Sequence, residues 1–258
     1  SMSDLVFNVI SHSAMILYLD NNNSTGEKSK ARREKWTTDG INENLARETL
    51  ELYTVTPGHG YTQEDVNGMT NILTGWRVKD WDNVYKAEFV DDYHEPGTHS
   101  VLGKKYSSTR NGIGQLQRVI KDLTSLEDTA NHVSFRLCQH FINDQPSPVH
   151  VAQLAAIYID NKGKLAPVYL GLLDILQSLE HKQDKFLNPE VWTYQTLNTL
   201  NIAVPTGVPK NRRFSPRNLD HILRELGLLH GEALQPNGWA EVEEDWLSNE
   251  YLNRRISF

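Results

Sequence analysis

Hydrophobic and polar positions follow helical spacing through most of the chain, most clearly from residue 42 to residue 53. At about 3.6 residues per turn, Leu45 and Leu50 lie on a side of the helix that further apolar residues extend, which predicts a face packed against the core. Asn42 stands where an N-cap is expected. The opposite side is polar and carries Glu43, Asn44, Arg47, Glu48 and Glu51.

A second helix is predicted directly after this one. The sequence Pro57-Gly58-His59-Gly60 is typical of a turn, because a helix does not continue through such residues. Thr62 followed by Asp65 three residues later resembles a capping box, which begins a helix. Apolar residues then recur at helical spacing at Val66, Met69, Leu73 and Trp76. We therefore predict two helices joined by a short turn.

Helical spacing also covers the beginning of the chain and most of the sequence after residue 107. The helix at residues 165–179 is so apolar that we expect it in the core. Further helices are expected at 5–18 with an interruption, around 116–123, up to Phe141, from Pro148, from Asn188-Pro189, from Ser215 to Gly227 and after Ser248.

One stretch favours strands instead. VYKAEFV and HSVLGKKY are strand-like, and HEPGT between them is typical of a hairpin loop. We therefore predict one small β-hairpin at residues 84–106. The whole chain, residues 1–258, is expected to form a mainly α, multi-helix single domain, with a mobile polar loop at residues 21–40.

Composition narrows the possible functions. The formal net charge of -7 argues against a general nucleic-acid-binding protein, which needs a basic face for phosphate contacts. A single cysteine, Cys138, excludes a disulfide within the chain. The sequence contains no run of eighteen apolar residues, so no membrane span is predicted. The exception to the acidic balance is a local cluster of Lys28, Lys30, Arg32, Arg33 and Lys35.

Common catalytic motifs are absent from the sequence. It contains no glycine-rich phosphate loop, HExxH, GxSxG or CxxC motif, so the usual nucleotide-binding, zinc-protease, serine-hydrolase and zinc-finger interpretations have no direct support. His94 and His99 are five residues apart in a predicted turn, a spacing that fits no standard zinc site. Neither a metal nor a cofactor can be assigned from the residues.

The polar side of the predicted helix at 42–53 has two interpretations. It is either a solvated surface with ion pairs at i,i+4 spacing, or a buried site in which Arg47 orients the glutamates. For the second case we hypothesise that Arg47 bridges Glu48 or Glu51 and that Glu43 points to solvent. Asp20 or Asp65 should then lie within reach of the same cluster.

Several separated motifs resemble the bacterial domain-of-unknown-function family 1800 over nearly the whole chain. In two places the chain departs from that family's usual pattern: Glu95 follows His94 where the family usually has aspartate, and His99 stands near a usual lysine. The matching motifs are HSAMILYLDN at 12–21, NENLARETLEL at 42–52, GYTQEDV at 60–66, LTGWR at 73–77, HEPGTHSVLG at 94–103 and PNGW at 236–239.

The resemblance implies a predominantly helical fold and a set of positions, but no reaction. Family members are usually longer, with a helical segment in front, so this chain resembles their C-terminal half. We therefore expect it to leave an apolar patch uncovered or to bury it in a homodimer. Many members look exported and are encoded beside a sulfatase-like protein, a possible partner. The implied positions are Asp20, Asn21, Asn42, Asn44, Arg47, Glu48, Glu51, Asp65, Gly75, Trp76 and His94.

Two functions remain open, and we favour the first. The chain is either a binding or structural module, with Arg47 and the glutamates fixing the helix pair, or an exported hydrolase acting on glycans or esters. In the hydrolase, the candidates for acid, base or binding of a hard cation are Glu48, Glu51, Asp65 and His94. The binding candidates are Asp20, Asn21, Asn44, Arg47 and Trp76.

Overall fold

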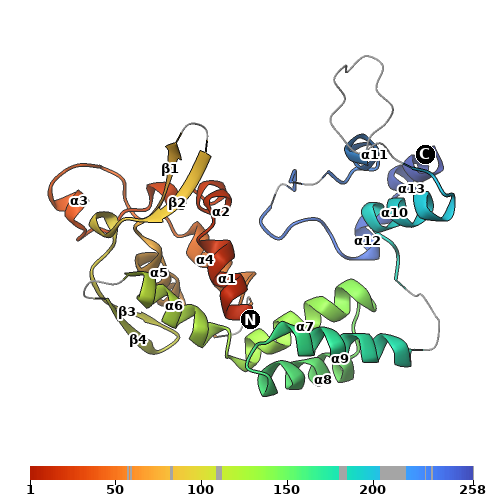
Figure 1. The fold of residues 1–258 in the computed structure, drawn as a ribbon, viewed down its shortest axis with the longest axis horizontal. Helices are drawn as coiled ribbons and strands as arrows, with labels where there is room; N and C mark the ends of the chain where they lie inside the picture. Colours follow the sequence, from red (N-terminus) through yellow and green to blue (C-terminus); the bar gives the residue numbers. More distant parts are fainter. Residues whose placement is uncertain are drawn as a thin grey trace, which may run out of the picture. The chain divides into compact units, whose positions relative to one another are not determined.

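The computed structural model describes residues 1–56, 58, 60–81, 84–108, 112–179, 185–203, 219–229, 231–233 and 235–257. Most elements in this part of the chain are helices, so the predicted mainly α fold is confirmed (Figure 1). Contacts within the chain divide it into two compact units. Unit 1 consists of Ser1–Arg136 and Pro148–Gln177, and unit 2 of Leu137–Ser147 and Ser178–Phe258. The prediction of one domain over residues 1–258 stays a prediction.

The core of unit 1 forms where amphipathic helices bury their apolar sides. Leu45 and Leu50 of the helix predicted at 42–53 are fully buried there, and so are Met69 and Ile72 of the following helix. The helices that line this core are α1 (Met2–Ile10), α2 (Ser13–Tyr18), α4 (Asn44–Glu51), α5 (Gln63–Leu73) and α6 (Gly112–Leu123). The predicted pair α4 and α5 is therefore confirmed.

The strands form two antiparallel pairs, so the predicted pairing of residues 84–90 with 99–106 is wrong. Gly75, with φ of 89°, ends the helical stretch, and Trp76 begins β1 instead of continuing α5. β3 and β4 are joined by Leu102 and Gly103, whose positive φ angles of 48° and 72° suit a tight two-residue hairpin turn. The pairs are β1 (Trp76–Trp81) with β2 (Val84–Phe89), and β3 (Gly97–Val101) with β4 (Lys104–Ser108).

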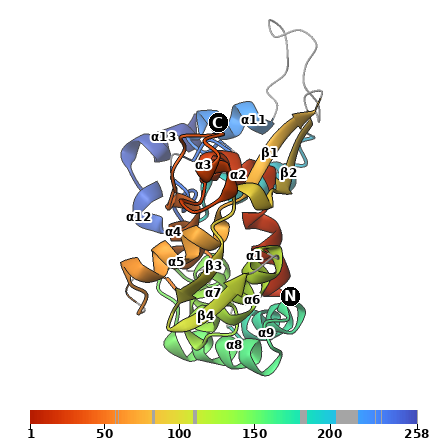
Figure 2. The same cartoon turned by 90° about the vertical axis from the view of Figure 1, so that its left-hand side faces the viewer.

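The second strand pair packs on the helical core: β3 lies against α5 and β4 against α6 (Figure 2). Gly68 of α5 makes this approach possible, because a Cβ atom there would lie 1.9 Å from the Ser100 carbonyl oxygen. Between the two hairpins the chain forms a short 3-10 helix, η2 (Asp91–Tyr93), in place of the predicted hairpin loop.

The segment at residues 21–40 contains η1 (Asn21–Asn23) and α3 (Lys30–Arg33). Its backbone is tied to other segments, since the Gly26 amide donates to the Tyr93 carbonyl at 3.0 Å. Polar residues of the segment are buried, among them Ser24, Thr25 and Ser29. The predicted polar loop is thus partly helical and packed, and its mobility stays a prediction.

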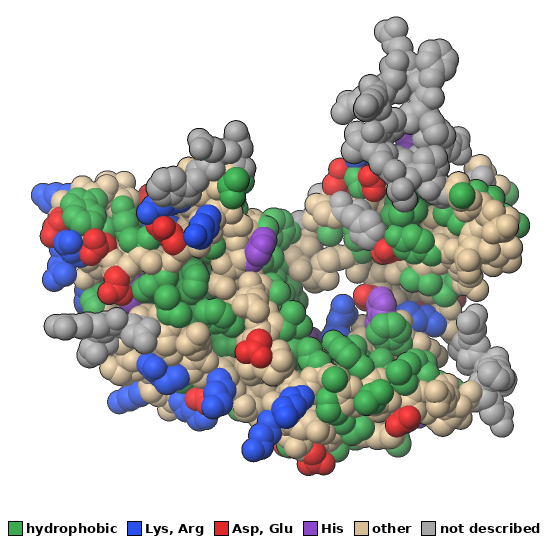
Figure 3. Space-filling model, viewed as in Figure 1, with side chains coloured by type: hydrophobic (Ala, Val, Ile, Leu, Met, Phe, Trp, Pro, Cys, Tyr) green, Lys and Arg blue, Asp and Glu red, His purple; other side chains and the backbone are tan. Residues whose placement is uncertain are grey.

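Three longer helices follow: α7 (Glu127–Phe141), α8 (Pro148–Asp160) and α9 (Leu165–Ser178). Pro148 opens α8 as predicted. The prediction that the very apolar α9 lies in the core is wrong for one of its sides. Leu172 is buried, whereas Leu170 and Leu173 are 63% and 51% exposed. Figure 3 shows hydrophobic side chains gathered on the surface over these helices.

Unit 2 contains α10 (Pro189–Thr199), α11 (Leu219–Glu225), α12 (Glu243–Trp246) and α13 (Asn249–Ile256). Asn188 caps α10 and Ser248 caps α13, as predicted. The predicted start at Ser215 lies outside the described residues. Asp144 binds Lys185 at 2.6 Å and accepts from the Glu243 amide, so one carboxylate joins three segments of this unit.

Candidate functional site

The polar side of α4 was the predicted site, and its geometry begins with the start of the helix. α4 begins at Asn44, and Glu43, not Asn42, takes the N-cap position. The Asn42 side chain instead accepts a hydrogen bond from the Asn44 amide at 2.9 Å, and the Asn42 amide donates to the Ser24 hydroxyl. Asn42 therefore anchors the segment before the helix, and the helix begins one residue later than predicted.

Arg47 lies at the centre of a polar network that joins α4 to α5. Its guanidinium binds Glu43 at 2.8 Å and Glu51 at 3.2 Å, and it also donates to the Gln63 amide oxygen at 3.1 Å. The Gln63 amide nitrogen in turn donates to Glu43 at 2.8 Å. The predicted bridge from Arg47 to Glu51 is confirmed. Glu43 lies at the surface, with its side chain 43% exposed, and its i,i+4 spacing also brings it to Arg47.

This network is a surface feature and not a buried site. The Arg47 side chain is 35% exposed and that of Glu43 is 43% exposed. Hydrogen bonds from Arg47 and Gln63 lower the pKa of Glu43, so this carboxyl stays ionised. Because water screens these groups, the loss of several kcal/mol expected when a buried pair is broken does not apply to Arg47.

Glu48 is set apart from the network. Partial burial, followed by the neighbouring charge of Glu51, raises the pKa of the Glu48 carboxyl. Burial also raises the pKa of Tyr53 to about 12, with the charge of Glu48 next in effect and a contribution from Tyr18. The pKa of Tyr61 is raised by burial and by a hydrogen bond to Glu51. Tyr53 and Tyr61 therefore lie near the two carboxylates of α4, and Tyr18 lies near Tyr53.

We call this surface the α4 face and define it as Tyr18, Arg47, Glu48, Glu51, Tyr53 and Tyr61. Sequence reasoning found its charged members but missed the tyrosines. Tyr53 follows α4 at the end of the stretch that was predicted as helical. Tyr18 ends α2 and Tyr61 precedes α5, so no spacing within one helix could have placed them on this surface.

Asp65 does not reach the α4 face, which corrects the hypothesis. Its side chain forms the predicted capping box with Thr62, accepting from the Thr62 amide and hydroxyl at 2.8 Å each. The other carboxylate oxygen accepts from the Leu102 amide at 2.6 Å. Asp65 thus ties the start of α5 to the turn between β3 and β4, which makes it a structural residue.

His94 is a core residue, 4% exposed. Nδ1 lies 2.9 Å from the Thr74 carbonyl oxygen, and Nε2 lies 3.1 Å from the Gln115 side-chain oxygen. Burial lowers the pKa of His94, and these hydrogen bonds partly oppose the effect. The Phe89 ring packs edge-on against the imidazole. Within the described residues, no hydrogen bond or ion pair joins His94 to the α4 face, so the four candidate catalytic residues do not converge.

The remaining predicted binding residues divide between core and surface. Asn21 is fully buried, and its amide donates to the Leu73 carbonyl at 3.2 Å. Trp76 is buried and packs edge-on against two phenylalanine rings. Asp20 and Asn44 are exposed, and Asp20 adopts a left-handed conformation with φ of 57°. No described contact brings Asp20 to Arg47, which also corrects the hypothesis.

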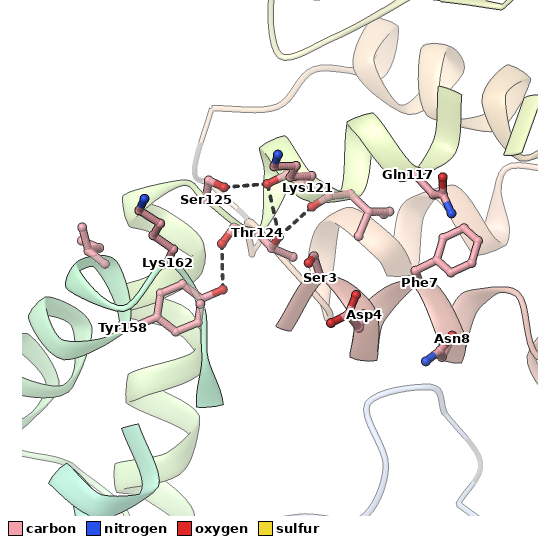
Figure 4. A pocket seen from close by; sticks show the side chains of 13 residues that line it. Ser3, Asp4, Phe7, Asn8, Gln117, Lys121, Thr124, Ser125, Tyr158 and Lys162 are labelled. Atoms are coloured by element: carbon pink, nitrogen blue, oxygen red, sulfur yellow. Dashed lines mark hydrogen bonds between the residues drawn. The ribbon is translucent and has the colours of Figure 1, made fainter. Parts of the chain in front are cut away.

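A separate cleft opens in unit 1 between α1, α6 and α8 (Figure 4). Its volume is about 810 Å³. None of the sequence-predicted site residues line it. The side chains that give the lining its chemical character are Asp4, Phe7, Lys121, Tyr158 and Lys162. Its parts lie far apart in the sequence, so periodicity could not have found it.

Two further properties bear on function. Within the part of the chain that the structure describes, no group of three or more histidine, cysteine, aspartate or glutamate side chains could hold a metal ion. The described helices also include none that is long and apolar enough to cross a membrane.

The described residues define a mainly helical protein with a tyrosine-rich, charged surface on α4 and a distinct cleft beside α1. A family model described as "Protein of unknown function (DUF1800)" matches residues 1–258, and the chain belongs to this family. This confirms the resemblance carried by the sequence motifs. No curated protein and no solved structure matches the chain.

Proposed function

We propose that the chain is a binding module that recognises another protein through the α4 face. The observation that carries the proposal is the state of Glu48. Its carboxylate is partly buried, its pKa is raised, and it has no hydrogen-bond partner in the described part of the chain. A carboxylate in that state gains more from a cationic donor on a partner than a fully hydrated one does.

The residue types on the α4 face support a protein partner. Tyrosine and arginine are enriched among the residues that dominate binding energy in protein interfaces. Tyrosine offers a large ring with few rotatable bonds, and arginine offers several hydrogen-bond donors in a planar group. Tyr18 is 51% exposed, so its ring is accessible. The partner surface should offer arginine or lysine to Glu48 and Glu51.

The Arg47 network supports the same proposal through rigidity. Arg47 is held by Glu43, Glu51 and Gln63, so α4 and α5 present the face in one arrangement before any partner binds. A surface that is ordered in advance loses less entropy on association. The network is thus the structural part of the module, and Glu48 with the tyrosines is the binding part.

The proposed partner is the sulfatase-like protein that the family resemblance implies, and the proposed place of action is outside the cytoplasm. The test is isothermal titration calorimetry of the two purified proteins. We expect saturable binding, and we expect Glu48→Gln and Tyr18→Ala each to weaken it by about tenfold or more.

Matched control variants exist on other surfaces. Tyr85 is 57% exposed on β2, so Tyr85→Ala removes the same side chain at an exposure similar to that of Tyr18. Glu64→Gln makes the same change as Glu48→Gln at an exposed glutamate of α5. Both controls should bind like the wild type. The proposal fails if no binding occurs, or if the control variants weaken binding as much as the α4 variants do.

One observation favours a second candidate, a hydrolase. Glu48 has a raised pKa and lies beside Glu51, which is paired with Arg47, so the Glu48 carboxyl is the candidate proton donor and Glu51 is the second carboxyl group of the pair. Nitrophenyl esters and glycosides test this directly. Hydrolysis that is lost in both Glu48→Gln and Glu51→Gln would support the enzyme, and hydrolysis that persists in both variants would refute it.

A further inference from the structure

The cleft between α1, α6 and α8 has the size and walls of a small-molecule site. Its volume of about 810 Å³ falls within the range of ligand pockets in proteins, about 300–1,000 Å³. Apolar side chains form part of its lining, namely Phe7, Ile120 and Ile159. The cleft shares no residue with the α4 face, so a ligand bound in it would act independently of the proposed function.

The base of the cleft is fixed by Tyr158. This side chain is almost fully buried, and its hydroxyl donates to the Thr124 carbonyl at 2.7 Å. The next turn of chain passes so close that a Cβ atom at Gly163 would lie 3.2 Å from the Tyr158 hydroxyl oxygen. Glycine at this position therefore keeps the ring in place and leaves the cleft open beside it.

The polar lining offers exposed donors that no residue of the described part of the chain occupies. Four side chains of the lining have no hydrogen-bond or ion-pair partner in the described part of the chain: Asn8, Gln117, Lys121 and Lys162. Two of these are ammonium groups, and the amides can also donate. The Ser125 hydroxyl, by contrast, already donates to the Lys121 carbonyl at 2.6 Å.

Figure 4 shows Lys121 on α6 and Lys162 beside the end of α8, with Thr124 and Ser125 between them. Lys162 reaches this position from a backbone with φ of 52°, a left-handed conformation that is costly for a residue with a side chain. Among the described residues of the lining, Asp4 is the only carboxylate, and it accepts a hydrogen bond from the Ser1 hydroxyl at 2.7 Å. Two lysines stand against this one carboxylate, so positive charge predominates in the lining.

We propose that this cleft binds a small organic anion with an apolar body. The ammonium groups of Lys121 and Lys162 would hold its carboxylate or phosphate group, and the amides of Asn8 and Gln117 would supply further donors. The apolar body would lie against Phe7 and its neighbours, where removal from water is favourable.

The experiment compares two probes with similar apolar chains and opposite charge. Sodium hexanoate and hexylammonium chloride are titrated into the full chain at low ionic strength, and binding is followed by calorimetry and by amide chemical shifts. Hexanoate should bind, with shifts at residues around the cleft, and hexylammonium should bind about tenfold more weakly or not at all. Inorganic phosphate, which lacks an apolar body, should bind more weakly than hexanoate.

Variants locate the site. The double variant Lys121→Gln with Lys162→Gln should weaken hexanoate binding by about tenfold or more, whereas Lys164→Gln, an exposed lysine two residues away that does not line the cleft, should leave it unchanged. Asp4→Asn should strengthen binding.

The proposal is overturned if hexylammonium binds as tightly as hexanoate, if phosphate binds more tightly than hexanoate, or if Lys164→Gln has the effect of the double variant. Tyr18→Ala should not change hexanoate binding, which separates this test from that of the α4 face.

Discussion

At the scale of single residues, His94 is the side chain whose environment most changes its expected role. Both ring nitrogens lie within hydrogen-bonding distance of oxygens inside the core, and no charged partner pairs with the ring among the described residues. A general base needs access to substrate, which a 4% exposed imidazole does not have. Changing or protonating His94 should therefore affect the stability of the fold and not a catalytic rate.

We predict that His94 makes the fold less stable in mild acid. Burial lowers its pKa below the ordinary value of 6.5, so the unfolded chain takes up the proton first as pH falls. Protonation of His94 does not affect the free energy of unfolding well above pH 6.5. This free energy decreases as pH falls through that value, until the folded state is also protonated. Asp91 opposes this shift and His99 adds to it.

Urea unfolding of the wild type and of His94→Gln between about pH 8 and pH 5 checks this prediction. The variant should be less stable at neutral pH, but its stability should fall less steeply toward acid. His150→Gln, which changes a histidine without a described partner on α8, serves as the control and should keep the wild-type slope. Equal slopes for His94→Gln and the wild type would show that His94 is not the group responsible.

Contacts of single residues could be predicted where both partners lie close together in the sequence. The capping box of Thr62 and Asp65 follows from two residues three positions apart, and so does the ion pair of Arg47 with Glu51 at i,i+4 spacing. The second contact of Asp65, with the Leu102 amide, spans 37 residues and has no local signal. The structural role of Asp65 in tying α5 to the second hairpin could therefore not be predicted.

At the scale of elements, the close approach of α5 to β3 determines how the second hairpin sits on the core. Alanine favours a helix over glycine by about 1 kcal/mol, so Gly68→Ala would stabilise an isolated α5. In the fold, however, the new Cβ would lie 1.9 Å from the Ser100 carbonyl oxygen, and a backbone atom of a paired strand has little room to move. Packing should therefore override helix propensity at this position.

We predict that Gly68→Ala lowers the free energy of unfolding by about 2 kcal/mol or more, measured by urea unfolding. Gly171→Ala in α9 is the matched comparison. There the new Cβ would meet the flexible Ile157 Cδ1 atom at 2.4 Å, so the loss should stay below about 1 kcal/mol. A Gly68→Ala protein as stable as the wild type would mean that α5 does not pack so closely on β3.

Element prediction succeeded for helices and failed for strand pairing for a physical reason. Helical periodicity depends on neighbours three and four residues away, so α4, α5, α8 and α10 could be predicted. Strand pairing depends on which turns are tight. The turn at Leu102 and Gly103 has only one glycine to mark it, and the actual partner of β2 is β1, which begins at a tryptophan assigned to the preceding helix.

At the scale of the whole molecule, the outer sides of α8 and α9 in unit 1 expose several large apolar side chains. Five large hydrophobic side chains on these helices are exposed by 46% or more: Val149, Ile159, Tyr169, Leu170 and Leu173. We call this the α8–α9 surface. Contiguous apolar surfaces of this kind usually mark an interaction site in soluble proteins. Overall apolar content predicted a core, but only the packing decides which side of α9 remains outside.

The last prediction is that the purified chain self-associates through the α8–α9 surface. Burying leucine and tyrosine side chains against a second copy removes apolar area from water, at about 25 cal/mol per Å², and a two-fold arrangement uses the same surface on both copies. Light scattering over a range of protein concentrations should show a mass rising toward that of a dimer.

Leu170→Glu combined with Leu173→Glu should restore the monomer, because association would then bury unpaired carboxylates. Val84→Glu on β2, which removes a hydrophobic residue of 65% exposure elsewhere, should leave association unchanged. A monomer at every concentration would contradict the prediction, and so would a Val84→Glu protein that dissociates like the double variant.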